Sequence, residues 1–140
     1  MRHFLLLMPT SIFFALGCGG DNRGLAPVSG TIFLNGKPLP NATIVFTPEE
    51  NDVRVGVGST DKDGKYSLSS FQTNDGVKIG KHKVSVRAFE DSGGAFKPAD
   101  DITNVRGKMT TPLKYANPEE SGLTAVVEKK KNVIDFQLQK

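Results

Sequence analysis

The sequence predicts an all-β domain, a β-sandwich of seven short strands, that follows an N-terminal export signal. From Val28 onward, apolar and polar residues alternate with a period of two, which indicates half-buried strands. Turn-forming residues separate the alternating stretches, and no stretch shows a convincing helical period. Short strands with frequent turns of this kind are typical of a sandwich.

The N-terminus has the build of a secretory signal. Arg2 and His3 supply a basic start, and ten of the thirteen residues 4–16 are apolar. A helix that crosses a bilayer needs roughly 20 apolar residues, so this stretch is too short to span one comfortably. We expect residues 1–17 to be removed as a signal peptide. Their removal leaves 123 of the 140 residues, which suits one domain.

Cys18, the only cysteine of the chain, directly follows this segment. The run Ala15-Leu16-Gly17-Cys18 resembles the lipobox of bacterial lipoproteins, although the order of its first two residues is swapped. The resemblance implies that the Cys18 thiol receives a diacylglycerol and that its new amino group is acylated, with palmitate as a typical chain. The alternative is an ordinary signal peptide with a chance cysteine, but a lone exported thiol would lack a disulfide partner. Gly19 then favours the outer membrane, by analogy with proteobacterial sorting.

Residues 18–27 are expected to form a flexible tether, because they are rich in glycine and polar residues. Strands are expected at 28–34, 42–47, 55–59, 66–68 and 82–89. Asn35-Gly36 predicts a type I′ turn after the first strand, since both central residues of that turn need positive φ. The last two strands, 123–128 and 133–138, are expected to form a hairpin with Lys129–Lys131 at its tip.

Residues 90–121 differ from the rest of the domain, 28–140. They contain three prolines, three glycines and few apolar residues. A connection of this length is unusual in a compact domain, and long loops are either functional or disordered. We therefore expect a long loop here.

The amount and the distribution of charge along the chain do not indicate binding to nucleic acid. The formal net charge is +3, and loss of Arg2 with the signal peptide lowers it to +2. The lysines are spread along the chain, and Lys129–Lys131 is the only run. Without a basic stripe or accompanying aromatic residues, we expect no binding to nucleic acid.

Three segments together resemble the carboxypeptidase regulatory-like domain. They are Val28-x-Gly30-x-Ile32 with Gly36-x-Pro38-Leu39 and Ala42-x-Ile44-x-Phe46-x-Pro48, then Thr60-Asp61-x-Asp63-Gly64-x-Tyr66-x-Leu68, and Gly80-x-His82-x-Val84-x-Val86. The resemblance implies a transthyretin-like sandwich of seven strands in Greek-key order. The C-terminal part, with Pro112-Leu113-Lys114-Tyr115 and Asp135-Phe136-x-Leu138, is similar to small planctomycete lipoproteins that carry this domain. The family supplies no catalytic residues to transfer.

Two groups of residues suggest chemistry and also have plainer interpretations. Asp61-Lys62-Asp63-Gly64 begins like a calcium loop, but position twelve is Gln72 rather than the bidentate Glu of an EF-hand. A hairpin turn capped by Asp61 is favoured over weak calcium binding by Asp61 and Asp63. His82, the only histidine left after cleavage, has no metal-ligand partners in sequence and is expected to be a packed ring. No G-x-S-x-G motif occurs, and we expect neither an enzyme nor a cofactor or metal.

Tyr115, Phe96 and Lys114 in the 90–121 loop are the candidate ligand or partner contacts. Tyr115 suits either a ligand-stacking ring or an anchor that holds the loop on the sandwich, and the anchor is favoured. The chain has no tryptophan, which lowers the prospect of carbohydrate binding. We expect a lipid-anchored, non-catalytic module of the bacterial envelope with a structural, adhesion or protein-binding role. The alternative is a lipoprotein that binds a small ligand or glycan through the loop.

Overall fold

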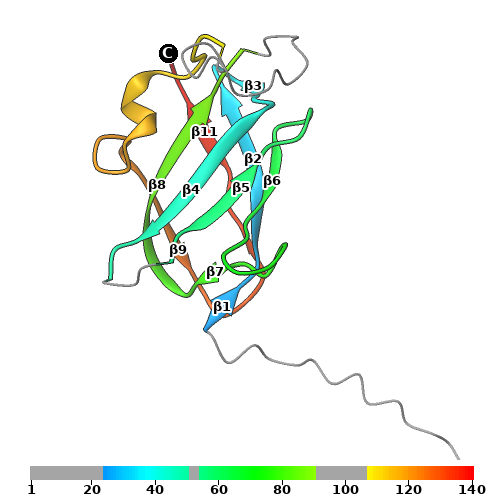
Figure 1. Cartoon of the computed structure of the whole chain (residues 1–140), viewed down its shortest axis with the longest axis vertical. Helices are drawn as coiled ribbons and strands as arrows, with labels where there is room; N and C mark the ends of the chain where they lie inside the picture. The colour runs from blue at the N-terminus through cyan, green and yellow to red at the C-terminus, as the bar shows by residue number, and fades with distance from the viewer. Residues whose placement is uncertain (1–23, 51–53, 91–106) are drawn as a thin grey trace, which may run out of the picture.

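The computed structural model describes residues 24–50, 54–90 and 107–140. Within these residues the regular structure is almost entirely extended, with one short 3-10 helix, η1 (Leu113–Ala116), so the predicted all-β class is confirmed. Figure 1 shows the long strands running side by side along the body of the domain. Two residues predicted to be functional, Cys18 and Phe96, lie outside the described residues.

One sheet contains four antiparallel strands in the order β5-β4-β8-β9. The two central strands are the long ones, and Phe46 of β4 pairs with Val84 of β8. Alternate residues of both strands are buried, as the alternating sequence predicts. The four strands are β4 (Ala42–Pro48), β5 (Gly56–Ser59), β8 (Gly80–Ala88) and β9 (Leu123–Val127).

The second sheet is built around β2 (Val28–Leu34). Along one edge, β2 pairs in parallel with β10 (Asn132–Val133) and β11 (Phe136–Leu138). Along the other edge, it pairs in antiparallel with β3 (Lys37–Pro38) and β6 (Lys65–Ser67). Strand β2 therefore lies between two groups of strands in this sheet. On one side are β3 and β6, and on the other are β10 and β11 from the C-terminal end of the chain.

A separate two-stranded ladder closes the end of the domain where the chain enters. It pairs β1 (Leu25–Ala26) with β7 (Val77–Lys78) in antiparallel fashion. Figure 1 shows this ladder at the lower end of the domain, whereas β3 and the C-terminus lie at the upper end. The end where the described chain begins is therefore formed by β1 and β7, and the opposite end carries β3 and the C-terminus.

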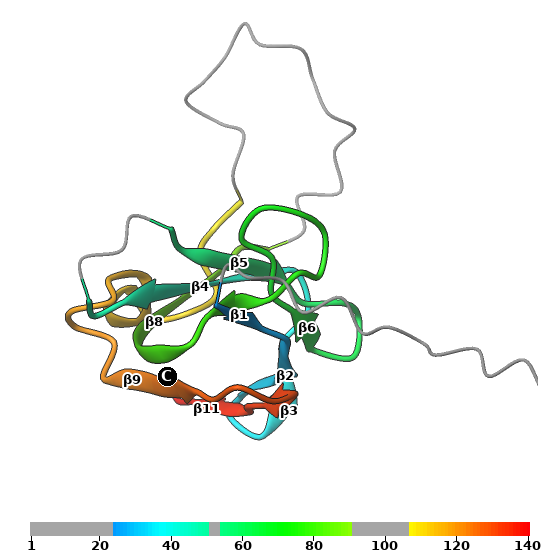
Figure 2. The ribbon, with the colours of Figure 1, turned by 90° about the horizontal axis from the view of Figure 1, so that it is seen from below.

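The hydrophobic core lies between the two sheets. Figure 2 shows β4, β5 and β8 in one layer and β2, β3 and β11 in the other. Phe46 is fully buried, and its ring meets the ring of Phe136 edge-on with the centroids 6.0 Å apart. Because Phe46 and Phe136 belong to different sheets, this contact joins the two layers.

The expected strands before residue 90 agree with the observed strands to within about two residues at most ends. Asn35 and Gly36 both have positive φ, at 50° and 78°, as the turn prediction requires. Among the described residues before position 90, the structure adds the two-residue strands β1, β3 and β7, which are too short to show a period in the sequence. Strand β1 lies within residues 18–27, so the end of the expected tether is paired with β7 instead of being flexible.

The predicted C-terminal hairpin is wrong. Strand β9 pairs with β8, whereas β10 and β11 leave for the other sheet and pair with β2. The side chain of Asn132 explains the change of sheet, because its Nδ2 donates to the carbonyls of Glu128 and Lys130, 3.0 and 2.7 Å away. These bonds close a tight turn, and the Asn132 N–H then donates to Pro27 O at 2.9 Å, beside the start of β2.

Gly30 allows the last strand to pass close to β2. A Cβ atom built on Gly30 would lie 1.8 Å from Ile134 O, well inside any real contact. Ile134 and Asp135 interrupt the ladder between β10 and β11, and the Asp135 carboxylate takes the place of a backbone acceptor by binding Thr31 N–H at 2.7 Å. Tyr66 covers the same place, because its hydroxyl donates to Ile134 O at 2.7 Å.

Replacing Gly30 with valine should therefore destabilise the domain. We expect the free energy of unfolding to fall by about 3 kcal/mol or more, at the upper end of overpacking effects. Chemical denaturation followed by circular dichroism would measure the change. Ser59→Val, at an exposed position of edge strand β5, is the control and should change stability little. Equal losses in the two variants would contradict this account of Gly30.

Candidate functional site

The candidate site is the segment of residues 107–122, which we call the η1 segment. Its first part continues the pairing of β8: Glu90 N–H donates to Lys108 O and Thr110 N–H to Ala88 O, each at 2.9 Å. Phe89 and Met109 form the bridge between these two bonds. The described part of the expected 90–121 loop is thus held by backbone hydrogen bonds, which the proline and glycine content did not predict.

Tyr115 fixes the η1 helix to the body of the domain. Its ring belongs to the hydrophobic core and is only 6% exposed. Its hydroxyl accepts a hydrogen bond of 3.1 Å from the N–H of Gln139, next to the end of β11. Nearby, Arg87 Nη2 of β8 donates to Ala116 O at 3.1 Å. These contacts are those of an anchor, and the ring is not offered to solvent for stacking.

Lys114 and Leu113 are the side chains that the η1 helix presents outward. The Lys114 ammonium lies 4.8 Å from the centroid of the Tyr115 ring, within the range of a cation–π contact. Leu113 is 74% exposed, the largest exposure among the large apolar side chains described. Sequence reasoning did not single out Leu113, because an isolated leucine after a proline has no pattern that distinguishes it from a core residue.

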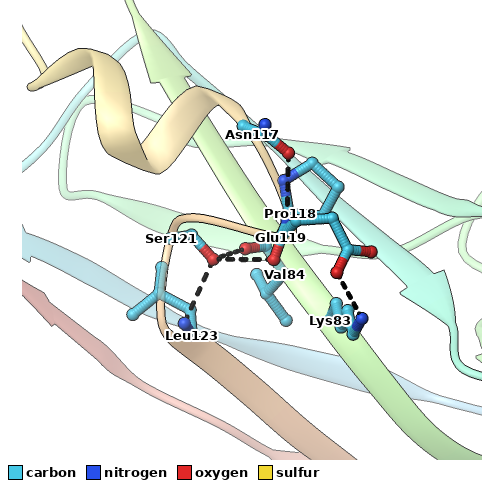
Figure 3. Close-up of polar contacts among 7 residues, drawn as sticks. All are labelled: Lys83, Val84, Asn117, Pro118, Glu119, Ser121 and Leu123. Atoms are coloured by element: carbon cyan, nitrogen blue, oxygen red, sulfur yellow. Dashed lines mark hydrogen bonds and ion pairs between the residues drawn. The ribbon is translucent and has the colours of Figure 1, made fainter.

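The far end of the η1 segment is fastened to β8, as Figure 3 shows. The buried Ser121 hydroxyl donates to Val84 O at 2.5 Å and accepts from Leu123 N–H at 3.1 Å. Lys83 forms an ion pair with Glu119 at 2.5 Å, and hydrogen bonding to this carboxylate raises the pKa of Lys83. Leu113 and Lys114 therefore stand on a backbone that is held from both sides.

The Asp61 turn is a capped hairpin turn, as favoured from the sequence. Asp61 Oδ1 accepts hydrogen bonds from Lys65 N–H at 3.0 Å and Asp63 N–H at 2.8 Å. These donors, with that of Lys65 having the larger effect, lower the pKa of the exposed Asp61 carboxyl. Weak calcium binding by Asp61 and Asp63 stays a prediction.

Asp75 lies in a different part of the domain from the Asp61 turn. Its two carboxylate oxygens accept from the N–H groups of Ser70, Phe71 and Gln72, at 2.8 to 3.0 Å. In the part of the chain that the structure describes, no three Asp, Glu, His or Cys residues are placed to hold a metal ion. The carboxylates of Asp61 and Asp75 cap backbone amides.

His82 is part of the core. It is 1% exposed, and its ring packs against Phe46 with the centroids 5.6 Å apart. Nδ1 lies 3.1 Å from Gly80 O, whereas Nε2 is buried with no hydrogen-bond partner among the described residues. Burial lowers the pKa of His82, because the charged imidazolium would lose its hydration. The packed ring expected from the sequence is what the structure places here.

The comparisons with known proteins assign no family. A scan against protein-family models finds no match, and a search of curated proteins finds none either. Within residues 24–50, 54–90 and 107–140, no helix is long and apolar enough to cross a membrane. The resemblance to the carboxypeptidase regulatory-like domain therefore stays a prediction.

His82 should make the domain less stable in mild acid. Its pKa is lowered in the folded state, so the unfolded chain binds more protons as the pH falls below the ordinary value of about 6.5. The stability that neutral His82 allows is present above that pH and is progressively lost as the pH falls from 7 to 5. Urea denaturation across this range should show the loss in the wild type and a weaker one in His82→Leu. The same pH dependence of stability in both proteins would contradict this role of His82.

Substitution of Tyr115 should separate its apolar and polar contributions. Tyr115→Ala should cost about 3 kcal/mol of folding stability, because a buried aromatic ring is removed. Tyr115→Phe should cost about 1 kcal/mol, because only the bond to Gln139 N–H is lost. Denaturation curves would measure both, with Leu113→Ala as the exposed control. A Tyr115→Ala protein as stable as the control would show that this ring is not an anchor.

Proposed function

We propose that this protein is a lipid-anchored β-domain on the outer side of a bacterial envelope, where it acts as a non-catalytic structural, adhesion or partner-binding module. The observation that carries the proposal is the position of Cys18, directly after a short apolar segment with a basic start. Two or more acyl chains at that cysteine would give stable attachment to a membrane. Gly19 favours the outer membrane as the destination.

The arrangement of the domain supports a role in which one end is tethered and the other is free to meet a partner. The described chain begins beside the β1–β7 ladder, at the lower end in Figure 1. The η1 helix lies toward the opposite end, close to Gln139 near the C-terminus. Leu113 and Lys114 would then point away from the membrane, on a backbone that needs little ordering before it binds a protein.

The burial of His82 supports the proposal that the module is not an enzyme. His82 is the only histidine that would remain after removal of residues 1–17. Its imidazole is enclosed by the core and packs on Phe46, so the ring is shielded from solvent. A general base must come within hydrogen-bond reach of the proton that it takes.

The finer fold that we propose is the transthyretin-like sandwich of seven strands in Greek-key order. Two layers with a shared core and the long central pair β4–β8 are compatible with it. The alternative function, a small-ligand or glycan lipoprotein, has less support because the Tyr115 ring is buried rather than open for stacking. It would rest on Lys114 and on Phe96, which lies outside the described residues.

Replacing Cys18 should release the protein from membranes. In bacterial cells that process lipoproteins, the wild type should sediment with the envelope, and its intact mass should include a diacylglycerol and an acyl chain at Cys18. The Cys18→Ser variant should lack this added mass, and it should no longer sediment with the envelope because it carries no lipid. Asn22→Ser, in the expected tether, is the control and should behave as the wild type. An unmodified wild-type N-terminus would remove the basis of the proposal.

A further inference from the structure

Lysine side chains gather at the end of the domain where the chain enters. The turn between β9 and β10 carries Lys129, Lys130 and Lys131, all exposed. The bond from Asn132 N–H to Pro27 O holds this turn beside β2, close to the β1–β7 ladder. Lys78 pairs in register with Leu25 of that ladder, and Lys81 follows at the start of β8. Two stretches far apart in sequence thus bring their lysines to one end.

Two exposed valines accompany these lysines. Val126 is 59% exposed and is the register partner of Lys81, and Val133 is 69% exposed and follows the lysine run. We call Lys78, Lys81, Val126, Lys129, Lys131 and Val133 the basic end. Apolar side chains next to long cationic ones are the combination that suits a membrane interface, where the ammonium groups reach headgroups and the apolar groups enter the boundary.

The turn that carries the lysine run is held in shape. Asn132 Oδ1 accepts from Glu128 N–H at 3.0 Å, and its Nδ2 donates to Lys130 O at 2.7 Å. Lys130 is used in an ion pair with Glu128, whereas Lys129 and Lys131 enter no ion pair with a described residue. The backbone that carries Lys129 and Lys131 is therefore fixed, and their positive charges are not offset by an ion pair with a described residue.

Acidic side chains at this end offset the charge only in part. Glu49 and Glu50 follow β4, and Glu49 N–H donates to Lys81 O at 3.0 Å. The Asp75 carboxylate is turned into its own loop, where it accepts from three backbone amides. The uncompensated positive charge is thus greatest at the β9–β10 turn, beside the point where the chain enters.

The length of the tether decides which surface the basic end would meet. This step rests on the proposed anchor at Cys18. Five residues lie between Cys18 and Gly24, the first described residue, and the six steps from one to the other span only about 20 Å even in a fully extended chain. The β1–β7 end would therefore stay close to the lipid that holds the anchor.

We propose that the basic end contacts the anionic lipid headgroups of the membrane in which the protein is anchored, and that this contact sets the orientation of the domain. Lysines near an anionic membrane surface are attracted to it over about a Debye length, which the tether keeps within reach. The η1 helix at the other end is then held outward, away from the bilayer.

Amine labelling of the full-length lipidated protein tests this proposal. The protein is reconstituted in vesicles of phosphatidylglycerol and phosphatidylethanolamine, or of phosphatidylcholine alone, and treated with an acetylating reagent. On the anionic vesicles, Lys129 and Lys131 should react about fivefold more slowly, and about 0.5 M salt should remove the difference. Lys37, Lys62 and Lys65, which lie at the β3 end, should react equally on both. Equal labelling of Lys129 and Lys131 on both vesicles would overturn the proposal.

Charge-reversed variants provide the matched comparison. A variant with Lys129→Glu, Lys130→Glu and Lys131→Glu should lose the slower labelling of Lys78 and Lys81 on anionic vesicles. A variant with Lys37→Glu, Lys62→Glu and Lys65→Glu has the same net charge and should keep it. Thermal unfolding of both checks that they are folded, and protection retained by the first variant would overturn the proposal.

The intact mass of each sample separates this proposal from the lipid anchor. A lipidated protein without protection refutes the headgroup contact and leaves the anchor standing. If the mature protein is unmodified, the anchor fails, and sedimentation of that protein with the same vesicles tests the contact directly. Salt-sensitive binding to anionic vesicles alone would support the contact, and no binding would overturn it.

Discussion

Strand β2 is paired along both of its edges, and the rest of the structure depends on this double pairing. One edge receives β3 and β6, which follow it in the chain, and the other receives β10 and β11 from the C-terminal end. Pairing along both edges gives most of the backbone groups of β2 a partner within the domain. The condition for this arrangement is that Gly30 carries no side chain, because the Ile134 carbonyl occupies the space where a Cβ would stand. The position of the C-terminus, and through Gln139 that of the η1 helix, follows from it.

The strands that could be predicted are those whose two faces meet different environments. In β4, Ala42, Ile44 and Phe46 are buried and Thr43 is exposed, so the period of two is visible in the sequence. The prediction of a hairpin at residues 123–138 was wrong. Two strands that form a hairpin and two strands that belong to different sheets show the same alternation of apolar and polar residues. Here the turn held by the side chain of Asn132 sends the chain to the other sheet. A sequence shows which face of a strand is apolar but not which strand lies beside it. The sequence favoured Tyr115 as an anchor, but it did not show the hydrogen-bond partner of its hydroxyl, the N–H of Gln139, which is distant in sequence.

Several polar side chains that suggest chemistry are committed to backbone groups. Asp61 caps its own turn, Asp75 holds three amides, and Asp135 supplies an acceptor where the ladder of β2 is interrupted. Each of these loops would otherwise leave N–H groups without partners, which is costly wherever water is excluded. This use explains why an acidic loop that begins like a calcium site can serve a purely structural purpose. These carboxylates therefore hold the loops in shape.

The two ends differ in a way that gives the domain a direction. At the β1–β7 end, lysines and exposed valines surround the place where the described chain begins, and the tether expected from the sequence is short. At the other end, Leu113 and Lys114 stand on a helix that Tyr115 and Ser121 fasten to the core. An anchor alone would leave such a body free to tumble on its tether. A second, weaker attachment through the lysines would restrict this motion, and a partner would then meet the η1 helix at a smaller entropic cost.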